Sequence, residues 1–295
     1  MWSPEVISAV SWEPLVLPAD VTKVVARAQS EWPSFSLFEK TSTGVKVPVA
    51  PRSFYVPVMY IEPVAPNRAA VGFDLHSEPA RASALAKAMT TGMATATSRL
   101  VLVQLPGCFA SLVFTPLYRA ADGFLDTQLN ASQVQTVDGF ISGVFVFQQI
   151  LAKALQNINI PARVDVLIFD NDAVAGSAYL SHYCSPSSDT CPYSFAASSG
   201  LMVGDIAFDV SRSLPFIFGG RRLQLVVVGR VGFIASRMSD TPLVMFLVSV
   251  AGVVCSFLAA QMWTFMARWR LRRAGQSFRY IFFEARVTPS ILPMS

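Results

Sequence analysis

The chain has 295 residues, of which 53% are hydrophobic and 14% charged, and this composition excludes an intrinsically disordered protein. Its formal net charge is +4, but the six arginines after Ala267 stand beside a single acid, Glu284, so residues 268–295 carry +5 and the rest carries −1. The positive charge therefore does not indicate nucleic-acid binding, and its position at one end is typical of membrane topology.

The first half predicts one small α+β module over residues 51–160. A helix is expected after Asp20, where apolar residues recur at helical spacing. Residues 54–61 read as a strand, with Pro57 at an edge or bulge. A second helix is expected between Ser77, as N-cap, and Gly92.

Three further strands are predicted in this half. Residues 99–105 and 110–118 read as strands joined by a tight turn at Pro106–Gly107, and residues 139–147 read as a strand that runs into a helix. The polar stretch between them contains the sequon Asn130–Ala131–Ser132, a glycosylation acceptor outside a eukaryotic cell.

A second α+β module is expected over residues 161–240. Residues 163–170, 178–183 and 221–230 read as strands, separated by turn sequences such as "NDAVAGS" and "FGG". Both modules combine a helix with antiparallel strands, so the predicted fold class is α+β.

Residues 241–267 contain no charged side chain and are long enough to cross a bilayer, at about 1.5 Å of rise per residue. The basic run "RWRLRR" follows, so residues 268–295 are predicted to be a cytoplasmic tail and residues 1–240 to be extracytoplasmic. The beginning of the chain has no signal-peptide pattern, and we therefore expect a preceding transmembrane helix in a longer protein.

The cysteines and the search for common catalytic motifs give little evidence for a particular function. Cys184 and Cys191 flank the polar run "SPSSDT" and form either a disulfide or two free thiols, and no C-x-x-C pair indicates zinc. The sequence contains no nucleotide-binding glycine loop and no G-x-S-x-G or H-E-x-x-H motif. His76 is interpreted as a surface or cap-adjacent residue rather than a catalyst, and His182 with Cys184 offers too few ligands for a metal site. Residues 170–172 are interpreted as a turn, and residues 219–222 as a hairpin turn with solvated arginines. We predict neither an enzyme nor a cofactor nor a metal site.

Several segments resemble the CHASE domain, a family of extracytoplasmic sensor domains of receptor histidine kinases and nucleotide or diguanylate cyclases. They are "PVMYIEPVAPNRAAVGFDL" (57–75), "SEPARASALAKAMTTG" (77–92), "TSRLVLVQ" (97–104), "FTPLY" (114–118) and "GFISGVF" (139–145). The resemblance implies an N-terminal stalk helix, of which residues 1–50 hold a remnant, followed by two PAS-like modules. It also implies flanking transmembrane helices and a homodimer.

The resemblance also implies a ligand site in the membrane-distal module. Arg81 stands where plant cytokinin receptors of the family carry an aspartate that binds the adenine-type ligand. An arginine cannot accept those hydrogen bonds, so we expect an anionic small molecule or a peptide instead, unless Arg81 simply pairs with Glu78. Thr97 matches a threonine needed for binding or signalling. The remaining candidates match pocket-wall positions and could equally be sheet core: Val103, Phe114, Thr115 and Gly143.

The sequence thus favours a ligand sensor that signals across the membrane to a cytoplasmic kinase or cyclase, which we expect outside this chain. Two alternatives remain open: an ectoenzyme anchored by its C-terminal helix, and a structural or adhesion ectodomain whose pocket is plugged by Phe114 and Met59.

Overall fold

The computed structural model describes residues 7–102, 105–119, 125–126, 137–156, 164–174, 178–184 and 210–229. It is a mixed α+β fold in which every ladder between strands of this part of the chain is antiparallel. The predicted fold class is therefore confirmed at this level, while the assignment of the modules as PAS-like stays a prediction.

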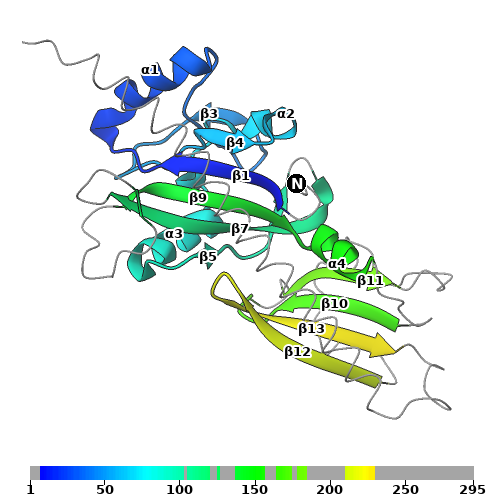
Figure 1. Ribbon diagram of the computed structural model, residues 1–295. Coiled ribbons are helices and arrows are strands. Elements are labelled where there is room, and N and C mark those ends of the chain that lie inside the picture. The colour runs from blue at the N-terminus through cyan, green and yellow to red at the C-terminus, as the bar shows by residue number, and fades with distance from the viewer. Residues whose placement is uncertain are drawn as a thin grey trace, which may run out of the picture.

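The larger sheet has seven strands in the order β4-β1-β9-β7-β5, with β6 and β8 also paired to β7 (Figure 1). Its strands are β1 (Ile7–Pro14), β4 (Tyr60–Glu62), β5 (Thr95–Ala96), β6 (Leu100–Leu102), β7 (Leu105–Arg119), β8 (Leu125–Asp126) and β9 (Val137–Val146). A separate hairpin joins β2 (Phe38–Lys40) to β3 (Lys46–Pro48).

The smaller sheet has four strands in the order β11-β10-β13-β12. They are β10 (Val164–Asp170), β11 (Tyr179–Cys184), β12 (Val210–Phe218) and β13 (Arg221–Gly229). The α-helices are α1 (Val21–Glu31), α2 (Val64–Asn67), α3 (Pro79–Thr91) and α4 (Phe147–Leu155), and the 3-10 turns are η1 (Pro18–Asp20), η2 (Arg68–Ala70) and η3 (Leu75–Ser77).

Each face of the larger sheet buries a different hydrophobic core. On one face α3 inserts Leu85 and Ala88 against Leu112 and Phe114 of β7. On the other face the core runs through α4 into the smaller sheet, which lies beyond α4 in Figure 1. Burial on both sides explains why most β7 and β9 side chains are apolar.

Helix α3 begins one residue later than predicted. Its N-cap is Glu78, whose carboxylate accepts hydrogen bonds from the backbone N–H groups of Ala80 (3.4 Å) and Arg81 (3.2 Å), whereas Ser77 closes η3. The predicted end is confirmed, because Gly92 adopts the left-handed conformation at φ 68° and its N–H bonds to Ala88.

Several strand predictions need correction. The predicted turn at Pro106–Gly107 is wrong, since both residues lie inside β7 and Leu102 already pairs with Leu105. Of the predicted strand 54–61 only its end belongs to a strand, β4. The N–H of Val56 bonds to the Asp74 carboxylate and that of Val58 to the Phe73 carbonyl, so a loop takes the place of a neighbouring strand.

Neither β1 nor β12 is among the predicted strands. In β1 alternate residues are buried, but two of these inward positions hold the polar residues Ser11 and Glu13, which obscures the apolar alternation. In β12 the interruption is Pro215, and the strand tolerates it because β12 is an edge of its sheet.

Across the described ranges no helix is long and apolar enough to cross a membrane. The predicted span 241–267 and the tail 268–295 lie outside the described residues, as do Val103, Asn130 and Cys191. Cys184 is disulfide-bonded, but its partner lies outside that part of the chain, so the pairing with Cys191 stays a prediction.

Candidate functional site

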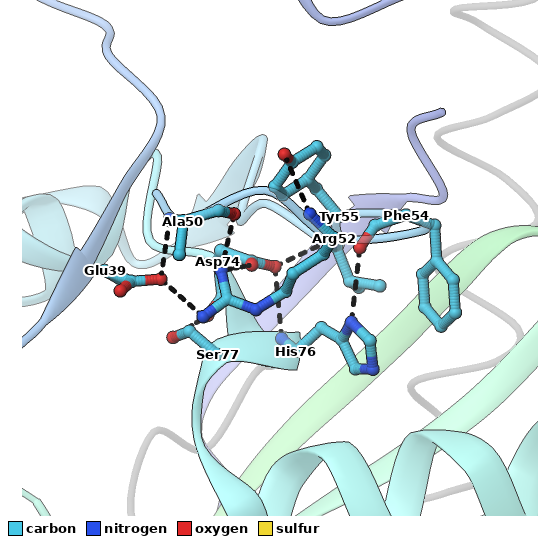
Figure 2. Close-up of polar contacts among 9 residues, drawn as sticks. Glu39, Ala50, Arg52, Phe54, Tyr55, Asp74, His76 and Ser77 are labelled. Carbon is cyan, nitrogen blue, oxygen red and sulfur yellow. Dashed lines mark hydrogen bonds and ion pairs between the residues drawn. The ribbon is translucent and has the colours of Figure 1, made fainter. Parts of the chain in front are cut away.

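Asp74 is the centre of a buried polar network (Figure 2). Its fully buried carboxylate accepts hydrogen bonds from the backbone N–H of Val56 (2.8 Å) and of His76 (3.1 Å), and Arg52 lies 3.4 Å away. Arg52 also pairs with Glu39 at 2.5 Å. Burial raises the Asp74 pKa, while these donors act in the opposite direction. The network ties segment 50–56 to the start of α3.

His76 belongs to this network as a structural residue. Its ring stacks on Phe54 with centroids 4.2 Å apart, and its Nδ1 lies 3.2 Å from the Phe54 carbonyl oxygen (Figure 2). Gly72 makes the preceding bend possible: its φ is +85°, and a Cβ there would lie 2.1 Å from the Ser36 carbonyl oxygen. Together these contacts fix Phe73, the residue between Gly72 and Asp74.

Arg81 lies beside Phe73 and is paired with Glu78. One guanidinium nitrogen is 3.1 Å from the Glu78 carboxylate, and the guanidinium carbon lies 5.4 Å from the Phe73 ring centroid. Burial lowers the Arg81 pKa, although Glu78 opposes this, and the Arg81 Nε atom is buried without a partner in the described part of the chain. The Glu78 pairing, one of the two alternatives open from the sequence, is therefore formed.

Two lysines extend this cluster of cations over aromatic rings. Phe73 packs against Phe38 with centroids 5.7 Å apart. Lys40 Nζ lies 5.8 Å from the Phe73 ring and Lys46 Nζ lies 4.1 Å from the Phe38 ring. Burial, and then repulsion from Lys46 and Arg81, lowers the Lys40 pKa. The ring faces attract the cations, but the mutual repulsion favours an added negative charge.

Thr97 and Phe114 are interior residues. The Thr97 hydroxyl accepts a hydrogen bond from the backbone N–H of Leu112 (3.1 Å) and lies 3.3 Å from the Ser111 hydroxyl. Phe114 is fully buried, edge-on to Phe140 at 6.2 Å, in the core beneath α3. Both side chains thus contribute to packing, and Phe114 fills space between the sheet and α3.

Thr115 and Gly143 meet on the opposite face of the sheet from Phe114. Along β7 and β9 the pairs Val113–Gly143 and Thr115–Ile141 alternate with the Phe114–Ser142 pair. Thr115 and Gly143 therefore face the side of the sheet opposite to Phe114. There they line a small hollow. The structure therefore brings these two predicted residues together, but not with Phe114.

A buried acid that the sequence did not reveal lies in β1. Glu13 is fully buried, and its Oε1 accepts a hydrogen bond from the Ser142 hydroxyl at 2.8 Å, which in turn lies 2.8 Å from the Ser11 hydroxyl. Glu13 Oε2 has no partner among the described residues. Burial raises the Glu13 pKa to about 8, against smaller lowering effects of the two serines. The sequence signal that could have revealed Glu13 is an acid at an inward position of a strand in which buried and less buried residues alternate.

The acidic turn and the arginine hairpin of the second module bind each other. The Arg221 guanidinium lies 2.7 Å from Asp170, and Arg222 Nε donates to Asp172 at 2.7 Å. Arg221 is 17% exposed, so it is an ion-paired rather than a solvated arginine, which corrects the prediction for that residue. In the ranges that the structure describes, no group of three His, Cys, Asp or Glu side chains could hold a metal ion.

The decisive comparison concerns the first 180 residues of the chain. The family model of the CHASE domain matches residues 3–180, which include β1, the Asp74 network, α3 and the core strands β7 and β9. The chain belongs to the CHASE domain family. A comparison with curated proteins returns no match.

CHASE domains are extracytoplasmic sensor domains of signalling receptors, and they are not catalytic. The matched region therefore has a sensory role. The tripeptide Gly72–Phe73–Asp74 lies within the stretch 57–75 that resembles the family, and in the structure it positions α3.

Proposed function

We propose that residues 1–240 are the extracytoplasmic ligand-sensing region of a transmembrane receptor that signals to a cytoplasmic histidine kinase or nucleotide cyclase. The observation that carries this proposal is the CHASE match over residues 3–180. The charge-free stretch 241–267 and the arginines that follow support a membrane helix with a cytoplasmic tail. A homodimer would let ligand binding change the packing of two such helices.

The proposed ligand is a small anionic molecule or an anionic peptide that engages Arg81 of the distal module. The Arg81 guanidinium, whose buried Nε has no partner in the described part of the chain, can donate hydrogen bonds to a ligand carboxylate beside or in place of Glu78. A ligand can shift a receptor between two states only by its differential affinity for them, and exchange of the Glu78 contact for a ligand contact would supply such a difference.

The test is thermal unfolding of the purified chain in detergent against a panel of carboxylates and adenine-type compounds. A ligand present at 100 times its Kd stabilises the folded state by about 2.7 kcal/mol, which raises the melting temperature. We expect a carboxylate to raise it, Arg81→Ala to abolish the shift, and Glu78→Gln to enlarge it by freeing the guanidinium.

The control is Lys87→Ala, which removes an exposed cation from the same helix and should leave the shift unchanged. An adenine-type binder that Arg81→Ala does not affect would contradict the anionic ligand. Absence of a shift with every compound would favour the structural ectodomain, in agreement with the burial of Phe114 and Met59.

A further inference from the structure

A cleft outside the two cores of the larger sheet lies between the end of α1, residues 34–38, β3 and η2. It encloses about 410 Å³ of space, part of it open to solvent. Its walls are half apolar and half polar: Trp32, Phe35, Phe38 and Val71 stand beside Ser34, Ser36, Lys46 and Arg68. Neither Arg81 nor any other predicted site residue lines it.

The two cations of the cleft lack acidic partners. No acid lines the cleft, and neither Lys46 nor Arg68 forms an ion pair with another residue of the described ranges. Lys46 instead lies over the Phe38 ring, and it repels Lys40 strongly enough to help lower the Lys40 pKa. Both side chains are exposed, so water screens their charges in part, but no acid lies among the lining residues and an anion in the cleft would be attracted by both cations.

An unpaired donor at the same place points independently to a ligand. Trp32 lines the cleft, and its indole Nε1 is shielded from water without a hydrogen-bond acceptor among the described residues. A buried N–H without an acceptor destabilises the folded state. Such groups are rare in native proteins and call for an explanation. Since Nε1 is shielded from water, a small rotation of the indole toward a ligand oxygen in the cleft would supply its acceptor.

We propose that this cleft binds a small organic anion with a carboxylate and a flat apolar body. The carboxylate lies between Lys46 and Arg68, where the planar guanidinium can donate two parallel hydrogen bonds. The apolar body packs against Phe35, Phe38 and Val71. The indole N–H of Trp32 donates to a ligand oxygen. The site holds whether or not the chain is a receptor. It shares Phe38 and Lys46 with the edge of the Arg81 cluster, but Arg81 itself does not line it.

The test uses benzoate as the probe, with benzamide as its neutral isostere and acetate as an anion without the ring. Calorimetry on the full chain in detergent should show benzoate binding at least about tenfold more tightly than either analogue, since benzamide lacks the charge-assisted hydrogen bonds and acetate lacks the ring contacts. The indole ¹⁵N–H resonance of Trp32, assigned with Trp32→Phe, should shift with benzoate alone.

Matched variants separate the cleft from general charge effects. Arg68→Gln and Lys46→Gln should each weaken benzoate binding about tenfold, Arg68→Lys should retain part of it, and Lys23→Gln, an exposed cation of α1, should change nothing. Arg81→Ala should also leave benzoate binding intact, so failure of the receptor proposal and failure of this one are distinguishable. Equal binding of benzoate and benzamide, or full affinity in folded Arg68→Gln and Lys46→Gln, would overturn the proposal.

Discussion

At the scale of single residues, Glu13 makes the stability of the fold depend on pH. The folded pKa of about 8 lies above the ordinary glutamate value of 4.5, so between these pH values the unfolded chain loses a proton that the folded chain keeps. The contribution of Glu13 to the stability of the fold is therefore largest below pH 4.5. This contribution falls by about 1.4 kcal/mol per pH unit up to pH 8 and is constant above that pH.

Glu13→Gln should remove this dependence, because glutamine resembles the protonated acid and keeps an acceptor for Ser142. Urea unfolding at several pH values should show that the free energy of unfolding of the variant, relative to the wild type, rises from pH 4.5 to 8 by up to a few kcal/mol. Glu62→Gln, an exposed acid on neighbouring β4, is the control and should follow the wild type throughout. A constant difference between Glu13→Gln and wild type across that range would refute the assignment.

At the scale of elements, the Asp74 carboxylate holds segment 50–56 and α3 in one arrangement. Asp74→Ala removes the acceptor for Val56 and His76 and leaves the half-buried Arg52 with Glu39 as its one acidic partner in the described network. Because loss of one member of a buried charged pair costs about 3–5 kcal/mol, we expect a loss near the upper end of single-substitution effects.

Denaturant unfolding of Asp74→Ala measures this loss, and Glu39→Gln is the control. The control alters the outer contact of the same arginine, whose partner carboxylate is 19% exposed, and should cost about 1 kcal/mol or less. If both variants lost the same small amount, the network would be a surface feature rather than the tie between the loop and the helix.

At the scale of the whole molecule, the two sheets share one hydrophobic core. Phe218 of β12 packs edge-on against Phe145 of β9 at 5.1 Å and against Phe147 of α4 at 5.8 Å. The Ala96 N–H donates to the Gly219 carbonyl at 2.7 Å, which joins β5 to the hairpin of the smaller sheet. These contacts couple the two sheets mechanically.

Phe218→Ala should destabilise the protein by about 3–5 kcal/mol, since it opens a cavity between the sheets. Ile217→Ala on the same strand is the control, because its side chain is 77% exposed and its loss should cost less than about 1 kcal/mol. Tyrosine fluorescence and amide exchange should report one cooperative transition for the wild type. Separate unfolding of the two sheets in the wild type would show that the shared core does not couple them.

Local patterns were sufficient for part of the fold and of the candidate site. The helix after Asp20, the α3 C-terminus at Gly92 and strands β9, β10 and β13 follow from periodicity and turn residues. The Glu78 alternative for Arg81 follows from helical spacing. Strand β1 could not be found in this way, because two of its inward positions are polar and only the serine hydroxyls around Glu13 make such a strand acceptable in a core.

The sequence by itself determined the fold class and the family, because both depend on local periodicity and on short motifs such as Gly72–Phe73–Asp74. Only the tertiary structure decided which side chains meet. It placed Thr115 and Gly143 on the opposite face from Phe114, joined Asp170 to Arg221 across 51 positions, and set Lys46 beside Arg68 in one cleft. Contacts between residues distant in sequence depend on strand order and register, and no local pattern encodes these.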